Sequence, residues 1–277
     1  MKIAALQMCS SIQVDQNIDA IAQAAQAAAS QGVIYLQTPE MSVMFAEKRA
    51  QLDAWATDEN VAQTLNALAD IARNNALYLH IGSMAVPAGD GRLFNRSFLF
   101  SPNGDLLDTY DKIHLFDADV EGDEPYRESD NYRPGEEAVV TPVGALNLGF
   151  SICYDVRFAH LYAALREADA NLMAVPAAFT VPTGEAHWHV LLRARAIETG
   201  SFLVAAAQGG AHENGRNTYG HSVIIDPWGR VLAEKADTEP GLIIAPLDLN
   251  LIKEARMRLP TLANRREFSL SVNRHMS

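Results

Sequence analysis

The hydrophobic and polar positions divide the chain into short apolar runs and longer stretches with apolar residues at helical spacing. The apolar runs predict strands at 2–8, 32–36, 77–81, 144–152, 171–175 and 202–207. The amphipathic stretches predict helices at 16–30, 62–75, 156–168 and 185–199. Strands that alternate with helices in this way indicate an α/β fold whose helices cover the outer faces of sheets.

Two segments share the pattern of an apolar strand, a Pro-x-Gly turn and a second apolar strand: FLFSPNGDLL (98–107) and VIIDPWGRVL (223–232). Because both halves of the chain repeat the same order of elements, we expect two similar halves packed face to face. A polar, acidic segment over 115–134 lies between them, and a loop of that length is often functional. The tail at 259–277 is predicted to be an arm that docks on another surface.

The composition narrows the class of protein. A chain of 277 residues fits one large α/β domain, here 1–277. The net charge of -12 disfavours nucleic acid and anionic membranes as partners. Two cysteines make a disulfide framework improbable, and no apolar run approaches the ~18 residues of a membrane span. The first residues turn polar too early for a signal peptide, so we expect a cytoplasmic protein.

Cys153 lies where a predicted strand leads into a predicted helix, in GFSICYDVRF (149–158). Such a junction can expose a nucleophile on a sharp turn beside backbone N–H groups. A free cysteine is also among the most often buried residues, so Cys153 alone is equally compatible with a core position. Cys9, near the end of the first strand, is predicted to be a core residue.

Three further residues are candidates for acid–base or electrostatic work. Glu40 follows a strand in VIYLQTPEMS, at the end of the sheet where α/β proteins place their sites. Lys112 lies in TYDKIHLFD, and Glu128 lies in PYRESDNYRPG within the acidic segment. Each of these side chains, taken singly, is more often an ordinary residue on a loop or at the surface.

The histidines offer a rival chemistry. His187 or His189 could pair with Cys153 as in a cysteine protease. Residues two apart on a helix do not share a face, so these two are a poor metal pair. The chain has no HExxH, CxxC, GxGxxG or Walker A motif, and both histidines are expected to be packed or hydrogen-bonded.

The stretches TPE, YDKIHLFD, RES and GFSICYDVRF together resemble the nitrilase superfamily of carbon–nitrogen hydrolases, over nearly the whole chain. The resemblance implies a four-layer αββα sandwich and a Glu-Lys-Cys triad that needs no cofactor or metal. In it Cys153 is the nucleophile, Glu40 the general base and Lys112 the oxyanion-stabilising cation, while Glu128 orients Lys112. It also implies a homodimer or higher homo-oligomer, with the C-terminal arm reaching across.

Details within the motifs narrow the substrate class. Tyr154 stands after the cysteine where true nitrilases have Trp, and CYDVRF with TGEAHW resembles the Nit branch of amidases. Within that branch the chain is similar to deaminated glutathione amidases, with omega-amidases as the alternative. A catalytically inactive binding module of the same fold is a further alternative. Thr38 departs from the aliphatic residue usual before Pro-Glu, and the loop at 208–220 matches no pattern.

The expected substrate is a small-molecule amide with a 2-oxo acid as its acyl part. Arg157 follows Cys153 by four residues, and its guanidinium suits the carboxylate of such an acyl group. An ion pair between Arg157 and Asp155 is the structural alternative. The resemblance further implies that the Tyr154 N–H faces the oxyanion and that Phe179 and Thr183 line the acyl pocket.

Overall fold

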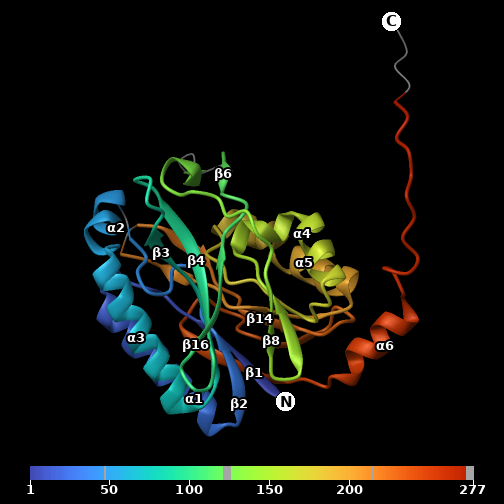
Figure 1. The fold of residues 1–277 in the computed structure, drawn as a ribbon, viewed down its shortest axis with the longest axis horizontal. Coiled ribbons are helices and arrows are strands. Elements are labelled where there is room, and N and C mark those ends of the chain that lie inside the picture. The colour runs from blue at the N-terminus through green and yellow to red at the C-terminus, as the bar shows by residue number, and fades with distance from the viewer. Residues whose placement is uncertain (47, 121–125, 214, 273–277) are drawn as a thin grey trace, which may run out of the picture.

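The computed structural model describes residues 1–46, 48–120, 126–213 and 215–272, and its strands form two six-stranded sheets flanked by helices (Figure 1). The first sheet has the order β16-β1-β2-β3-β4-β5. Its strands are β1 (Lys2–Gln7), β2 (Val33–Gln37), β3 (Tyr78–Pro87), β4 (Leu93–Phe100), β5 (Leu106–Asp111) and β16 (Gly241–Pro246). Helices α1 (Val14–Ser30), α2 (Arg49–Trp55) and α3 (Asp58–Asn75) belong to this half.

The second sheet has the order β15-β14-β11-β10-β9-β8. Its strands are β8 (Val140–Val143), β9 (Leu146–Gly149), β10 (Leu172–Ala174), β11 (Phe202–Ala205), β14 (Val223–Ile225) and β15 (Val231–Glu234). Helices α4 (Ala159–Glu167) and α5 (Val181–Thr199) belong to this half. The remaining elements are β6 (Asp117–Ala118), β7 (Tyr126–Arg127), β12 (Gly209–Ala211), β13 (Asn217–Tyr219), the 3₁₀ turns η1 (Glu128–Asp130) and η2 (Cys153–Arg157), and α6 (Asn250–Arg258).

The two sheets repeat one topology. In each, three parallel strands (β1-β2-β3 and β9-β10-β11) continue into two antiparallel ones (β4-β5 and β14-β15). An antiparallel strand closes the opposite edge, β16 beside β1 and β8 beside β9. The two similar halves predicted from the Pro-x-Gly hairpins are therefore confirmed.

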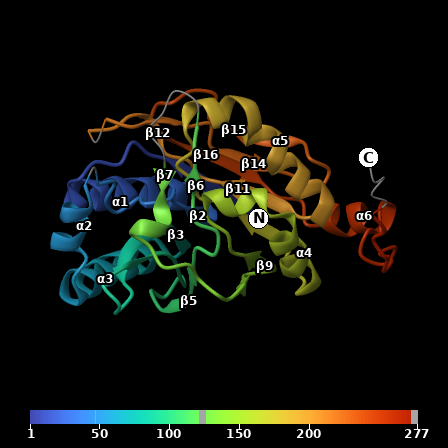
Figure 2. The same cartoon turned by 90° about the horizontal axis from the view of Figure 1, so that it is seen from above.

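Apolar side chains fill the spaces between four layers. In β1, Ile3 and Ala5 pack into the core shared with the second sheet, whereas Ala4 and Leu6 pack toward α1 and α3. This two-residue period is expected of a strand buried on both faces. Figure 2 shows α1 and α3 on one side of the strands and α4 and α5 on the other. The predicted αββα sandwich is confirmed.

Several predicted boundaries were wrong. The strand predicted over 144–152 is shorter, β9 at Leu146–Gly149, because Gly144, at φ +60°, belongs to the turn between β8 and β9 and no strand continues over 150–152. The helix predicted over 156–168 is divided into the turn η2 and helix α4. The segment 115–134 contains the small β6–β7 ladder and η1, with 121–125 outside the described residues.

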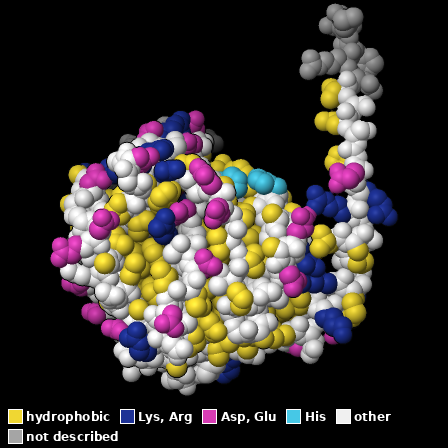
Figure 3. Space-filling model, in the orientation of Figure 1, with side chains coloured by type: hydrophobic (Ala, Val, Ile, Leu, Met, Phe, Trp, Pro, Cys, Tyr) yellow, Lys and Arg dark blue, Asp and Glu magenta, His cyan; other side chains and the backbone are white. Residues whose placement is uncertain are grey.

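After α6 the described tail, 259–272, has no helix or strand and projects from the body of the molecule (Figure 3). Its large apolar side chains Phe268, Leu270 and Val272 are exposed. Residues 273–277 of the predicted arm lie outside the described residues. Among the residues described, no helix has both the length and the hydrophobicity needed to cross a membrane.

Candidate active site

Cys153 occupies a sharp turn at the end of the second sheet. Its φ is +48°, a left-handed conformation that costs a non-glycine residue of the order of 1 kcal/mol and must be held by its surroundings. The backbone N–H of Cys153 donates to the Pro176 carbonyl at 2.9 Å, which ties the turn to the segment after β10. The side chain is 9% exposed. The predicted strand-to-helix junction is thus a strained, nearly buried turn.

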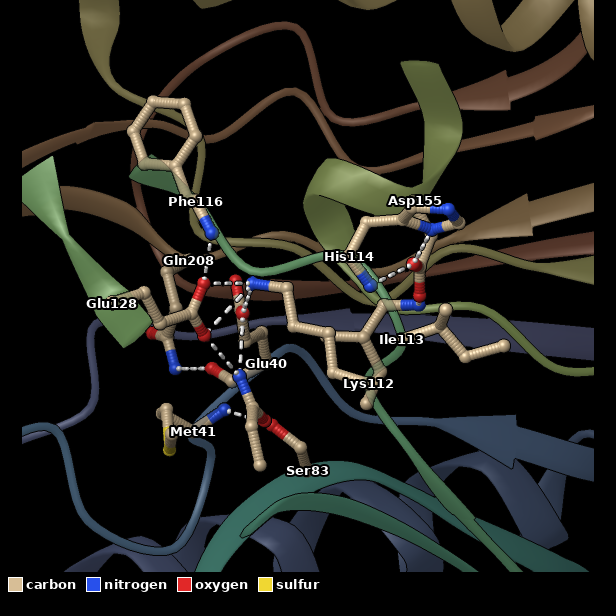
Figure 4. Close-up of polar contacts among 12 residues, drawn as sticks. Glu40, Met41, Ser83, Lys112, Ile113, His114, Phe116, Glu128, Asp155 and Gln208 are labelled. Atoms are coloured by element: carbon tan, nitrogen blue, oxygen red, sulfur yellow. Dashed lines mark hydrogen bonds and ion pairs between the residues drawn. The ribbon is translucent and has the colours of Figure 1, made fainter. Parts of the chain in front are cut away.

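Asp155 holds this turn in place. Its buried carboxylate accepts hydrogen bonds from the Ile152 N–H at 2.8 Å and the Tyr110 hydroxyl at 2.7 Å. It also accepts one from the His114 N–H at 3.0 Å, and His114 Nδ1 lies 2.7 Å away (Figure 4). Because these contacts take up both oxygens, Asp155 supports the nucleophile's turn and is not the ion-pair partner considered for Arg157.

Glu40 lies on a second strained turn, at the end of β2. Met41, the next residue, has φ +52°, and its N–H donates to Ser83 Oγ at 2.9 Å. Gln208 Nε2 donates to the Glu40 carbonyl at 3.0 Å (Figure 4). The unusual Thr38 is buried, and its hydroxyl accepts from the Gly82 N–H at 3.0 Å, so a polar residue is fully accommodated there.

Lys112 joins the two carboxylates that the sequence placed far apart. Its Nζ lies 2.9 Å from Glu40 Oε1, and 3.1 Å and 2.8 Å from the two oxygens of Glu128 (Figure 4). The Lys112 side chain is 2% exposed. Glu128, at the start of η1, is oriented by the Phe116 N–H, which donates to its Oε2 at 2.6 Å. The acidic segment thus supplies a partly buried negative charge beside Lys112.

The charges of Glu40, Lys112 and Glu128 determine the protonation states of Glu40 and Lys112. Burial alone would raise the pKa of the Glu40 carboxyl, but the Lys112 ammonium and hydrogen bonds from Lys112, Cys153 and Asn95 bring that pKa below its ordinary value. Burial would lower the pKa of Lys112, yet Glu128 and Glu40 raise it well above its usual range. We therefore describe the resting site as a carboxylate beside an ammonium.

The pKa of the Cys153 thiol is raised, whereas that of the Glu40 carboxyl is lowered. Burial, followed by the negative charge of Glu40, raises the pKa of Cys153 well above that of a free cysteine, and Lys112 offsets only part of this. A hydrogen bond from the Ala178 backbone also favours the thiolate. The resting sulfur is consequently a thiol that donates a hydrogen bond to Glu40, and it becomes nucleophilic only as Glu40 takes its proton.

Of the four predicted pocket residues, Arg157 lies near two others, Tyr154 and Phe179. The guanidinium carbon of Arg157 lies 5.9 Å from the Tyr154 ring centre and 5.5 Å from that of Phe179. Arg157 Nη1 is 3.3 Å from His187 Nδ1. Thr183, in the first turn of α5, hydrogen-bonds through its hydroxyl to Thr180 Oγ1 at 2.8 Å. The substrate-binding roles of these residues stay predictions.

Sequence reasoning missed Asn95 and misplaced Cys9. Asn95, on β4, donates through Nδ2 to Glu40 Oε1 at 2.9 Å and to Glu128 Oε1 at 3.1 Å. An asparagine at an inward position of a hydrophobic strand was the only available signal. Cys9 is partly exposed, with its sulfur 3.6 Å from His212 Nδ1, so the core position predicted for it was wrong.

The histidines on α5 are hydrogen-bonded, as expected. His187 faces Arg157, whereas His189 Nε2 lies 2.7 Å from Glu234 Oε1. Within the described residues, the only group of three or more potential metal ligands is His189, His221 and Glu234. None of these belongs to the group of Glu40, Lys112 and Cys153.

The family model for carbon–nitrogen hydrolases matches residues 2–257. The chain belongs to the carbon–nitrogen hydrolase family. The deaminated glutathione amidase of Yersinia enterocolitica is 38% identical over 98% of this chain and 95% of the relative. The human deaminated glutathione amidase is 36% identical over 95% of this chain and 82% of the relative.

Solved structures of the family have the same fold. The C. elegans NitFhit protein superposes with a TM-score of 0.86 at 32% identity, over 96% of this chain, which spans 65% of that protein. An amidase from Nesterenkonia sp. AN1, whose active-site cysteine carries acrylamide, superposes with a TM-score of 0.79 at 29% identity, over 95% of this chain and 99% of that one. This carbon–nitrogen hydrolase has amidases among both its relatives and its structural neighbours.

Proposed function

We propose that this carbon–nitrogen hydrolase is an amidase that cleaves deaminated glutathione to 2-oxoglutarate and cysteinylglycine through a thioester on Cys153. The observation that carries the proposal is the buried contact of Lys112 with both Glu40 and Glu128, beside the thiol. Curated relatives named for this activity, aligned along almost the full chain, support the choice of substrate.

The first half-reaction forms the thioester. Cys153 Sγ attacks the amide carbonyl carbon while its proton passes to Glu40, and the carbonyl oxygen becomes an oxyanion. The Lys112 ammonium and the Tyr154 N–H stabilise that oxyanion, and each such donor is typically worth ~3 kcal/mol in the transition state. Glu40 then gives the proton to the leaving nitrogen, the C–N bond breaks, and the free amine departs.

The second half-reaction hydrolyses the thioester. Glu40, again a carboxylate, takes a proton from water as the water oxygen attacks the thioester carbon. The C–S bond breaks, and the sulfur recovers a proton from Glu40. Glu128 keeps Lys112 charged throughout, because burial without a second carboxylate would lower the pKa of the lysine.

Recognition of the acyl group falls to Arg157. Its guanidinium carbon lies 5.9 Å from the Tyr154 ring centre and 5.5 Å from that of Phe179, and a planar guanidinium suits the carboxylate beside a 2-oxo group. Thr183 is proposed to line the same pocket. Omega-amidase activity is the second candidate, because 2-oxoglutaramate presents the same acyl half and differs only in its leaving group.

One experiment separates the alternatives. Purified protein is offered deaminated glutathione and 2-oxoglutaramate side by side, and 2-oxoglutarate, the common product, is followed with Cys153→Ala as the control. A higher kcat/KM for deaminated glutathione supports the proposal, and a higher value for 2-oxoglutaramate supports the omega-amidase alternative. If the wild type releases no product from either substrate, both are rejected.

We also propose that two copies of this chain associate through the surface formed by α5, the β14–β15 hairpin and the tail. Exposed apolar side chains gather there, which is typical of an interaction surface: Val190, Ile197, Trp228, Val231, Leu232, Leu259 and Leu262. Sedimentation equilibrium tests this. The wild type should be a dimer, and Val190→Asp should shift it toward the monomer.

A further inference from the structure

We propose that His189, His221 and Glu234 form a binding site for a divalent transition-metal ion of the Zn²⁺ type, separate from the catalytic group. The three potential ligand atoms lie within 4.8 Å of one another. His189 Nε2 is 2.7 Å and His221 Nδ1 is 3.4 Å from the same oxygen, Glu234 Oε1. Two imidazoles with one carboxylate are a common protein ligand set for zinc, with a water in the fourth position.

Three separate elements bring these ligands together. His189 lies on α5, His221 lies just before β14, and Glu234 ends β15, where it pairs with Val223. Helix α5 lies against β14 and beside β15 (Figure 2). The sequence spacing argued against a metal pair of His187 with His189, and it gave no sign that the fold brings His221 and Glu234 next to His189.

The backbone of His221 is held firmly in position. Its φ is +58°, a conformation that a histidine adopts only when its surroundings hold it there. The Trp188 indole N–H donates to the His221 carbonyl at 2.8 Å, which links α5 directly to this residue. The Tyr219 ring stacks on the His221 imidazole with centroids 4.2 Å apart. The imidazole is therefore orientated before any ion binds.

Two of the three separations between the ligand atoms are close to those of a tetrahedral site, and the third, between the two imidazole nitrogens, is at most 4.8 Å. Metal–ligand bonds of about 2.0–2.2 Å in a tetrahedron place neighbouring ligand atoms roughly 3.3 Å apart. The His221–Glu234 separation already fits, and the His189–Glu234 contact must open by about half an ångström. The nearby ammonium of Lys235 is paired with the Asp237 carboxylate, so together these two groups add no net charge near His221.

The test is zinc binding by calorimetry, with ZnCl₂ alone and protein free of any histidine tag. Both cysteines are first replaced, as Cys9→Ser and Cys153→Ala, so that neither thiol contributes. We expect one ion per chain. In this background Glu234→Gln and His221→Ala should each weaken zinc binding by at least tenfold. Even the loss of a residue that only hydrogen-bonds a metal ligand typically weakens metal binding 10- to 100-fold.

His187→Ala is the matched control, two residues from His189 on the same helix but turned toward Arg157, and it should bind zinc as the background does. Co²⁺ provides a second readout, because its visible absorption reports a four-coordinate site with nitrogen ligands. Zinc should also raise the melting temperature of the background protein but not of Glu234→Gln. No binding by the background protein, or equal binding by Glu234→Gln and His221→Ala, overturns the proposal.

Discussion

The Lys112 ammonium lies 2.9 Å from Glu40 Oε1, and both side chains are buried. The contact helps a buried carboxylate to stay ionised: burial raises the pKa of Glu40, but the Lys112 charge and the hydrogen bonds from Lys112, Cys153 and Asn95 together outweigh that effect. It also means that Glu40 is ionised before the substrate reacts, and is ready to take the proton of the neighbouring Cys153 thiol.

Lys112→Met tests that relationship. We expect kcat to fall by about 10²–10³, the usual effect of losing one oxyanion donor. Without the ammonium, burial dominates and the pKa of Glu40 rises, so less of the base is ionised at low pH. The acidic limb of the kcat/KM profile should therefore move to higher pH than in the wild type. An unmoved limb would show that Lys112 does not control the charge of Glu40.

Glu128→Gln tests whether Glu128 is a positioning residue that acts through Lys112. The amide can still accept a hydrogen bond, but its lost charge allows the pKa of Lys112 to fall. We expect kcat to drop at least about tenfold with KM little changed, and the alkaline limb of kcat to move to lower pH. Asp130→Asn, on the same turn and exposed, is the control and should behave as the wild type.

Arg157→Met should impair only substrates whose acyl group carries a carboxylate. Losing a charge-assisted hydrogen bond is worth about 1.5–3 kcal/mol, or roughly 10- to 150-fold in kcat/KM. Steady-state kinetics with deaminated glutathione and with a neutral short-chain amide separate the two effects. Equal losses on both substrates would mean that Arg157 supports the pocket without recognising the carboxylate.

Asp155→Asn should destabilise the protein and disturb the nucleophile. An amide cannot accept all the hydrogen bonds that the carboxylate receives from Ile152, Tyr110 and His114. We expect a loss of about 2–3 kcal/mol in the free energy of unfolding by urea. The exposed ion pair of Asp119 with Arg127 gives the control, and Asp119→Asn should change stability by less than about 0.5 kcal/mol.

The sequence predicted the layers of this fold well because their signal is local. Periodic apolar residues marked most of the central strands and the four flanking helices, and the two Pro-x-Gly hairpins revealed the repeat. It missed helices α2 and α6 and the edge strands β8 and β16, which are short or only partly buried. It also gave no sign that Gly144 belongs to a turn and not to the strand that follows it.

The residues of the candidate site likewise fall into those that the sequence predicted and those that only the structure shows. Glu40, Lys112, Glu128 and Cys153 were found through motifs, and the fold brings the four together. The residues that hold them, such as Asn95, His114 and Asp155, act across the sheets through contacts far apart in sequence. No local pattern encodes such contacts, so only the folded chain shows them.

Mass spectrometry of the enzyme, quenched with acid during turnover of deaminated glutathione, tests the central claim most directly. The account predicts a 2-oxoglutaryl adduct on the peptide that contains Cys153, removed by hydroxylamine as a thioester is, and absent from Cys153→Ala. Turnover that persists in Cys153→Ala, or an adduct on any other residue, would contradict it.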